Sequence, residues 1–225
     1  MQIRFRDRIE AGRLLAEKLG EYANRSDVIV LALPRGGVPV GFEVAQALKA
    51  PLDVLIVRKL GVPEQPELAM GAIASGGIRV LNDDLLRHYP IPADVIDSIT
   101  KVEREELERR ERIYRGDRPL SNVEGRTVIL VDDGIATGTT MRSAVESLKR
   151  RNAAEIVIAV PVAPATIFEE FHRVKNHLVI TCLWTPEPFI AVGLWYDQFP
   201  QLSDEEVREL LNRPTRYRVV ERVDS

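Results

Sequence analysis

Residues 128–141 read VILVDDGIATGTTM. Its first four residues are apolar and three of them are β-branched, which is typical of a strand buried on both faces of a parallel sheet. Two adjacent carboxylates, Asp132 and Asp133, end the strand, and residues 134–140 form a loop of small and hydroxyl side chains before the next helix. The pattern predicts a strand, an acidic pair and an anion-binding loop in direct succession.

The loop has the chemistry of a phosphate site. Gly134 and Gly138 allow the backbone to bend and to approach an anion closely, and Thr137, Thr139 and Thr140 offer hydroxyl donors. The N-terminus of the following helix adds free N–H groups and a partial positive charge. The neighbouring acids suit hydroxyl groups or a chelated cation instead. The expected ligand therefore carries a phosphate beside a diol, as ribose 5-phosphate does.

Simpler interpretations explain less of the stretch. A plain strand-to-helix turn would use Asp133 as a helix cap, but it leaves Asp132 and the run of hydroxyls without a role. The Walker loop is excluded because Thr139 occupies the position where that motif requires lysine, and no G-x-G-x-x-G turn is present. A phosphatase of the D-x-D type is disfavoured because the two acids are adjacent.

The stretch resembles the phosphoribosyl pyrophosphate binding loop of type I phosphoribosyltransferases, in which an apolar strand, two acids and a T-G-T-T-like loop follow one another. The resemblance implies that Asp132 and Asp133 act at the ribose as catalytic residues. It implies a substrate-binding role for the loop residues Gly134, Ile135, Ala136, Thr137, Gly138, Thr139 and Thr140. It also implies Mg²⁺ as a cofactor bound with phosphoribosyl pyrophosphate, with Asp132 and Asp133 as the candidate protein ligands of the metal.

A second segment of this kind lies near the start of the chain. Residues 28–33 form an apolar run that predicts a strand, and the motif PRGG follows it before a helix with a proline in its first turn. By the resemblance, Arg35, Gly36 and Gly37 bind the leaving pyrophosphate.

A third apolar run, residues 52–57, is expected to be a strand that ends on Arg58 and Lys59. Two cations at a strand end are commonly a solvated edge, but the resemblance assigns this pair to phosphate contacts in catalysis. Ligands of open α/β sheets bind beyond the carboxyl ends of the strands, so we expect the three segments to meet around one molecule.

The chain between these segments predicts a mobile loop and a charged helix. Residues 61–67 contain two prolines and few apolar anchors, so we expect a flexible loop that the family closes over the reacting centre. A hairpin over residues 69–81 would carry this loop. Residues 93–115 predict a helix with a solvated face and no ligand. Its first half should be anchored by three apolar residues, Val95, Ile99 and Val102.

Strands and helices alternate through the rest of the chain, which predicts an α/β fold. We expect a single domain of the type I phosphoribosyltransferase kind, with a mostly parallel sheet flanked by helices, a small hood or cap, and the hairpin-borne flexible loop. The domain should span residues 1–213, and residues 214–225 should form a C-terminal tail. The aromatic residues of the segment 186–200 are expected mainly to pack.

Composition excludes several classes of protein. A net charge of −3 and a pI near 5.8 give no basic footprint for nucleic acid. No apolar run is long enough to cross a membrane and no leader is recognisable, so we expect a cytoplasmic protein. One cysteine, Cys182, excludes an intrachain disulfide and a cysteine-cluster metal site, and its apolar surroundings predict an inert thiol.

The expected function is Mg²⁺-dependent transfer of the 5-phosphoribosyl group from phosphoribosyl pyrophosphate to a nitrogen nucleophile, with release of pyrophosphate. Ala136 stands where family members acting on 6-oxopurines usually carry aspartate, which disfavours hypoxanthine and guanine. The identity of the acceptor base and the formation of a homodimer are left open. The alternative is a regulatory protein that binds phosphoribosyl pyrophosphate without turning it over; no DNA-binding segment supports that alternative.

Overall fold

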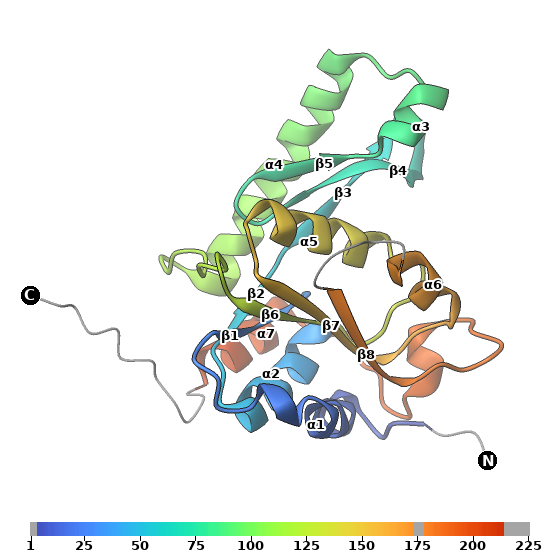
Figure 1. Ribbon diagram of the computed structural model, residues 1–225. Helices are drawn as coiled ribbons and strands as arrows, with labels where there is room; N and C mark the ends of the chain where they lie inside the picture. The colour runs from blue at the N-terminus through green and yellow to red at the C-terminus, as the bar shows by residue number, and fades with distance from the viewer. Residues whose placement is uncertain (1–3, 173–177, 214–225) are drawn as a thin grey trace, which may run out of the picture.

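The computed structural model describes residues 4–172 and 178–213. A five-stranded parallel sheet forms its centre, with the strand order β2-β1-β6-β7-β8 (Figure 1). These strands are β1 (Val28–Ala32), β2 (Leu52–Val54), β6 (Thr127–Val131), β7 (Glu155–Val162) and β8 (Leu178–Trp184). β1 and β6 pair in parallel along their whole length, and every residue of both is buried. The predicted α/β fold with a mostly parallel sheet is confirmed.

Helices cover both faces of this sheet (Figure 1). One face carries α1 (Arg8–Lys18) and α2 (Gly37–Leu48), and the other carries α5 (Thr139–Arg150) and α6 (Thr166–His172). The strand β6 contributes side chains to the cores on both faces of the sheet. Ile129 packs in the cluster with α1 and α2, and Leu130 packs in the cluster with α5 and α6. This alternation explains why the run 128–131 is continuously apolar.

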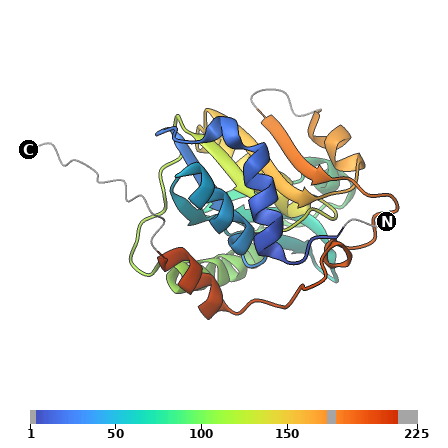
Figure 2. The same cartoon turned by 90° about the horizontal axis from the view of Figure 1, so that it is seen from below.

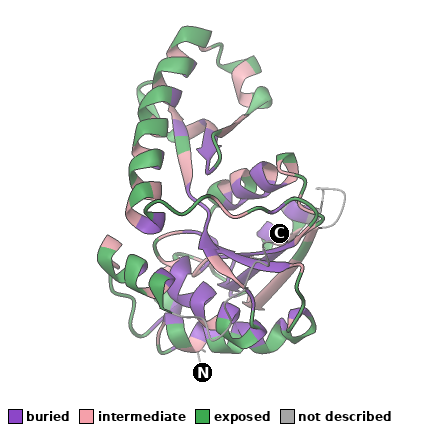
Figure 3. Ribbon diagram, turned by 90° about the vertical axis from the view of Figure 1, so that its left-hand side faces the viewer, coloured by how far each residue is buried: buried purple, intermediate pink, exposed green. Residues whose placement is uncertain are grey.

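A second sheet is antiparallel, with the order β3-β4-β5. It contains β3 (Val57–Val62), β4 (Gln65–Ala74) and β5 (Ile78–Leu81), followed by α3 (Asp83–His88) and α4 (Ala93–Arg115). We call residues 57–115 the arm, because they project from the main sheet (Figures 1 and 3). The predicted hairpin over residues 69–81 is confirmed by the pairing of β4 with β5.

The prediction of one strand over residues 52–57 was wrong. The strand of the main sheet ends at Val54, and Arg58 and Lys59 lie inside β3, a strand of the arm. The chain changes sheets at the buried residues 55–56, where the N–H of Ile56 donates to Ser75 Oγ at 3.0 Å. A short apolar run has the same composition whether it belongs to one buried strand or to two.

The expected loop over residues 61–67 is mostly strand. β3 continues to Val62 and β4 begins at Gln65, so two residues make the turn between them. The pairing is irregular around Gly61, where a β-carbon would lie 2.8 Å from the carbonyl oxygen of Pro66. A bulge of this kind accommodates a proline within a strand pair. The mobility of the segment stays a prediction.

The charged helix α4 is anchored only in part as expected. Ile99 packs, partly buried, against a hydrophobic cluster that joins the arm to the main sheet, but Val102 is 64% exposed, and the buried anchors are Ile96 and Leu107. The last residue of the helix, Arg115, is buried, and its Nε donates to Asp53 Oδ1 at 2.9 Å. This ion pair with a residue of β2 connects the arm to the main sheet.

The C-terminal part of the described chain returns to the N-terminal side (Figure 2). A short 3₁₀ helix, η2 (Val192–Trp195), leads to Tyr196, which bridges Phe5 in parallel. The last helix of the described chain is α7 (Asp204–Asn212), which starts at a capping box of Ser203 and Glu206. Another 3₁₀ helix, η1 (Gly20–Tyr22), follows α1. Residues 214–225, the predicted tail, lie outside the described residues.

Cys182 lies in β8 and is half-buried. Burial raises the pKa of its thiol to about 11, which keeps it protonated at neutral pH and agrees with the expected inert thiol. Within residues 4–172 and 178–213, the structure contains no helix with the length and apolar character needed to span a bilayer.

The contrast within α4 gives a test of the fold. Leu107→Ala should lower the free energy of unfolding by about 2–5 kcal/mol, because Leu107 is 2% exposed and its loss leaves a cavity. Val102→Ala on the same helix should change it by less than about 0.5 kcal/mol. Urea denaturation of both variants measures the difference. Similar losses for the two would contradict this packing of α4.

Candidate functional site

The acidic pair and the PRGG motif meet at the carboxyl ends of two neighbouring strands. The N–H of Leu33, at the end of β1, donates to the carbonyl oxygen of Val131 at 2.8 Å. Beyond this bond, a β-carbon on Gly36 would lie 1.9 Å from Asp133 Oδ2. A β-carbon on Gly37 would lie 2.7 Å from the same Val131 oxygen. The two glycines are therefore required for the close approach of the loop to the acids.

Asp133 has two partners that the sequence did not indicate. Arg8, the first residue of α1, donates from Nε to Asp133 Oδ2 at 2.8 Å. The hydroxyl of Tyr196 donates to the backbone oxygen of Asp133 at 2.6 Å. Both partners are distant in the chain and neither belongs to a recognisable motif. The only sequence signal was the aromatic content of the segment 186–200, which was expected to pack.

The two carboxylates have different surroundings. Asp132 Oδ1 accepts the N–H of Asp133 at 2.8 Å. Burial and the neighbouring carboxylate raise the pKa of Asp132 well above its usual range. Burial also raises the pKa of Asp133, but Arg8 opposes this rise. The pair thus combines one carboxylate that is held by a cation with one that is stabilised mainly by a backbone N–H.

The loop 134–140 presents a helix N-terminus beside the acids. The N–H of Ile135 donates to the carbonyl oxygen of Val162 at 2.9 Å, and the Ile135 side chain is buried. Gly138 adopts a left-handed conformation with φ of 71° and lies immediately before α5. This conformation suits glycine and directs the chain into the helix. Thr137 and Thr140, which follow the anchored part of the loop, are exposed.

A cleft of about 430 Å³ joins this loop to the arm. Thr137, Thr139 and Thr140 line it from the loop, and Arg58 and Lys59 line it from β3. The structure therefore brings the predicted cations to the predicted phosphate loop, although they come from a different sheet.

Both cations of this cleft are paired with acids. Arg58 donates to Glu103 Oε2 of α4 at 2.7 Å, and both side chains are partly buried. Lys59 Nζ lies 3.2 Å from Glu67 Oε2, a side chain that is 98% exposed. An exposed pair of this kind contributes about 0–1 kcal/mol, so an anionic ligand can replace Glu67 as the partner of Lys59.

Arg35 is the predicted site residue that points elsewhere. Its guanidinium is about half exposed and lies 3.9 Å from Asp204 Oδ1, at the start of α7. The backbone of the PRGG loop reaches the acids, but the described Arg35 side chain contacts α7. The peptide bond between Pro34 and Arg35 is cis.

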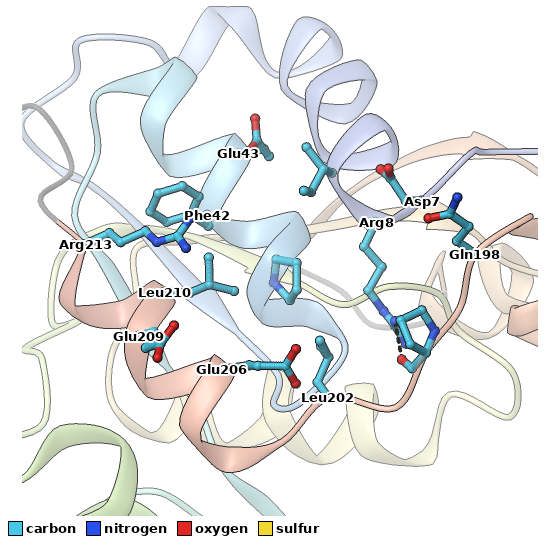
Figure 4. Close-up of a pocket in the computed structure, with 13 residues that line it drawn as sticks. Asp7, Arg8, Phe42, Glu43, Gln198, Leu202, Glu206, Glu209, Leu210 and Arg213 are labelled. Atoms are coloured by element: carbon cyan, nitrogen blue, oxygen red, sulfur yellow. Dashed lines mark hydrogen bonds between the residues drawn. The ribbon is translucent and has the colours of Figure 1, made fainter.

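A separate groove of about 400 Å³ runs between α1, α2 and α7 (Figure 4). Its lining is mainly apolar, with Phe42, Leu202 and Leu210 among the residues that surround it. Arg8 contributes to the wall of the groove and also donates from Nη1 to the carbonyl oxygen of Pro200 at 2.8 Å. Arg8 thus separates the groove from the acidic pair.

Comparisons with known proteins agree with this arrangement. The model of the phosphoribosyl transferase domain matches residues 6–176. Two proteins of Mycobacterium tuberculosis, from strains CDC 1551 / Oshkosh and ATCC 25618 / H37Rv, are 48% identical over 212 residues and are provisionally named phosphoribosyl transferases. The match covers 94% of this chain and 47% of each relative, so the chain spans about half the length of these curated relatives.

A solved structure agrees in fold. The crystal structure of a protein from Thermus thermophilus superposes with a TM-score of 0.80 at 41% sequence identity. The superposition covers 93% of this chain and 98% of the other. The likeness therefore includes the arm and the main sheet together.

Gly36 provides a test of the contact between the PRGG loop and the acids. Gly36→Ala should lower the free energy of unfolding by about 1–3 kcal/mol, because its methyl group would collide with the carboxylate of Asp133. Gly20→Ala is the control, since a β-carbon there meets nothing within 4 Å. Equal stability of the two variants in urea would show that the loop and the acids do not touch.

Proposed function

The chain belongs to the phosphoribosyl transferase domain family, and on that premise we propose that it transfers the 5-phosphoribosyl group of phosphoribosyl pyrophosphate to a nitrogen nucleophile. The acceptor is a nucleobase or a related compound, and pyrophosphate is released. The observation that carries the proposal is the convergence of the acidic pair, the loop 134–140 and the PRGG backbone at the carboxyl edge of β1 and β6.

Each part of the substrate has a matching part of the site. The 5-phosphate binds at the N-terminus of α5, where the loop offers backbone N–H groups and threonine hydroxyls. The ribose hydroxyls donate to carboxylate oxygens of Asp132 and Asp133, which lie at the carboxyl end of β6. The pyrophosphate lies between the backbone of Gly36 and Gly37 and the cleft that contains Arg58 and Lys59.

The chemistry requires stabilisation of two opposite charges. The bond between C1 of the ribose and the pyrophosphate oxygen breaks with its electron pair on oxygen, and the lone pair of the acceptor nitrogen forms the new bond to C1. A proton leaves that nitrogen for solvent. The carboxylates of the acidic pair favour the positive charge that develops on the ribose, while Arg58 and Lys59 favour the departing anion. Positioning supplies most of the remaining catalysis.

The residues present fit a metal ion that is bound jointly by protein carboxylates and by the phosphates of the substrate. Within the described parts of the chain, no group of three or more histidine, cysteine or acidic side chains could hold an ion. Mg²⁺ is commonly bound by one or two carboxylates together with substrate phosphates, and Asp132 and Asp133 are the carboxylates in reach of the proposed substrate. Bound in this way, Mg²⁺ would neutralise charge on the leaving pyrophosphate.

Ala136 restricts the range of proposed acceptors, because it is exposed in the loop and has no carboxylate that could contact a base. We therefore propose an acceptor other than a 6-oxopurine. A cytoplasmic location and a homodimer belong to the same proposal.

The acids give the first test of this function. Asp132→Asn and Asp133→Asn should each weaken binding of phosphoribosyl pyrophosphate with Mg²⁺ at least tenfold, because an amide is a poorer acceptor for ribose hydroxyls. Calorimetry measures binding, and pyrophosphate release with a panel of nucleobases measures turnover. Asp117→Asn, at an exposed turn, is the control and should match the parent. Binding without turnover of any base would indicate a sensor, and unchanged binding in both acid variants would exclude the assigned roles.

Thermal unfolding gives a second test. Phosphoribosyl pyrophosphate with Mg²⁺ should raise the melting temperature by several degrees, since a ligand at a hundred times its dissociation constant stabilises by about 2.7 kcal/mol. Ribose 5-phosphate should raise it less, because it does not reach Arg58. Arg58→Met should remove the advantage of the pyrophosphate form and keep the response to ribose 5-phosphate. ATP and NAD serve as controls, and equal stabilisation by either would indicate a generic anion pocket.

A further inference from the structure

Arg8 makes three contacts that fix its guanidinium in one place. Nε donates to Asp133 Oδ2 at 2.8 Å, and Nη1 donates to the carbonyl oxygen of Pro200 at 2.8 Å. The carbon of the guanidinium lies 3.7 Å from the centre of the Phe199 ring. The Arg8 side chain is 9% exposed. An arginine with both its edge and its face engaged has little freedom to move.

These contacts determine where the carboxylate of Asp133 lies. Arg8 contacts one of its oxygens, and Gly36 approaches the same oxygen so closely that a β-carbon cannot be accommodated. The hydroxyl of Tyr196 holds the backbone of Asp133 at 2.6 Å. The acid is therefore held by α1, by the PRGG loop and by the segment 186–200, and its orientation does not depend on a ligand.

We propose that Arg8 is a positioning residue for recognition of the ribose hydroxyls, acting through Asp133. This inference rests on the proposed function, since it assigns a task to the acidic pair at the ribose. Arg8 binds Oδ2 and leaves Oδ1 of Asp133 as an acceptor for a hydroxyl. It also compensates the charge of one of two adjacent carboxylates, so that both can remain side by side in a buried setting.

The geometry requires the planar guanidinium of arginine and not only a positive charge. A guanidinium donates along two directions in one plane while its face stacks on an aromatic ring. The ammonium of a lysine can pair with Asp133, but it cannot stack on Phe199 with the same plane that carries the hydrogen bonds. Arg8→Lys should therefore retain part of the effect, and Arg8→Met should lose it while keeping an apolar stem in place.

The experiment compares two ligands that share a phosphate. Ribose 5-phosphate uses both the loop 134–140 and the acids, whereas inorganic phosphate uses only the loop. Arg8→Met should weaken binding of ribose 5-phosphate at least tenfold and leave binding of inorganic phosphate within twofold of the parent. Arg8→Lys should fall between the parent and Arg8→Met for ribose 5-phosphate. Calorimetry or NMR titration gives the dissociation constants, and circular dichroism confirms folding.

Arg13 offers a matched control on the same helix. Its Nε donates to Glu43 Oε2 at 2.9 Å, away from the acidic pair, so Arg13→Met should bind both ligands as the parent does. Equal weakening of both ligands by Arg8→Met would mean that Arg8 only supports the fold, and unchanged binding of ribose 5-phosphate would also overturn the proposal. If Arg8→Met fails to fold, Arg8→Lys decides: a loss of threefold or more for ribose 5-phosphate alone supports positioning, and parental affinity overturns it. A parent protein that binds neither ribose 5-phosphate nor phosphoribosyl pyrophosphate would refute the proposed function itself.

Discussion

Two adjacent carboxylates, Asp132 and Asp133, follow the buried strand β6, and distant parts of the chain converge on them. Removing the only cationic partner of a buried charge typically costs about 3–5 kcal/mol, so an acid in this position needs compensation from its surroundings. Asp133 obtains it from Arg8, whose contacts also include Phe199 and Pro200. The N-terminal helix and the aromatic segment near the C-terminus are thus held together around one side chain of the site.

Local features of the sequence predicted the central part of this arrangement. The run 128–131 is apolar at every position because both faces of β6 are covered, and this continuity is visible without a structure. The two glycines of PRGG were expected beside the ligand, and their contacts with Val131 and Asp133 show why side chains are excluded there. Such features are predictable because chain geometry over a few residues determines them.

Features that depend on distant pairing were not predictable in the same way. Arg8 and Asp133 are 125 positions apart in the chain, and an arginine in the first turn of a helix is usually exposed to solvent. Arg35 was expected at the pyrophosphate, but its described partner is Asp204. The division of residues 52–62 between two sheets depends on the partners of each strand, Val30 to Ala32 for β2 and β4 for β3. A single sequence does not state which strands pair.

The boundary between the two sheets runs through the cleft itself. Threonines from a loop of the main sheet face cations from a strand of the arm, and the arm joins the sheet through residues 55–56 and the buried end of α4. The two halves of the cleft therefore belong to two different sheets of the fold. A change in the length or packing of the arm would therefore change the width of the cleft, while the strand that carries the acids would keep β1 and β7 as its neighbours.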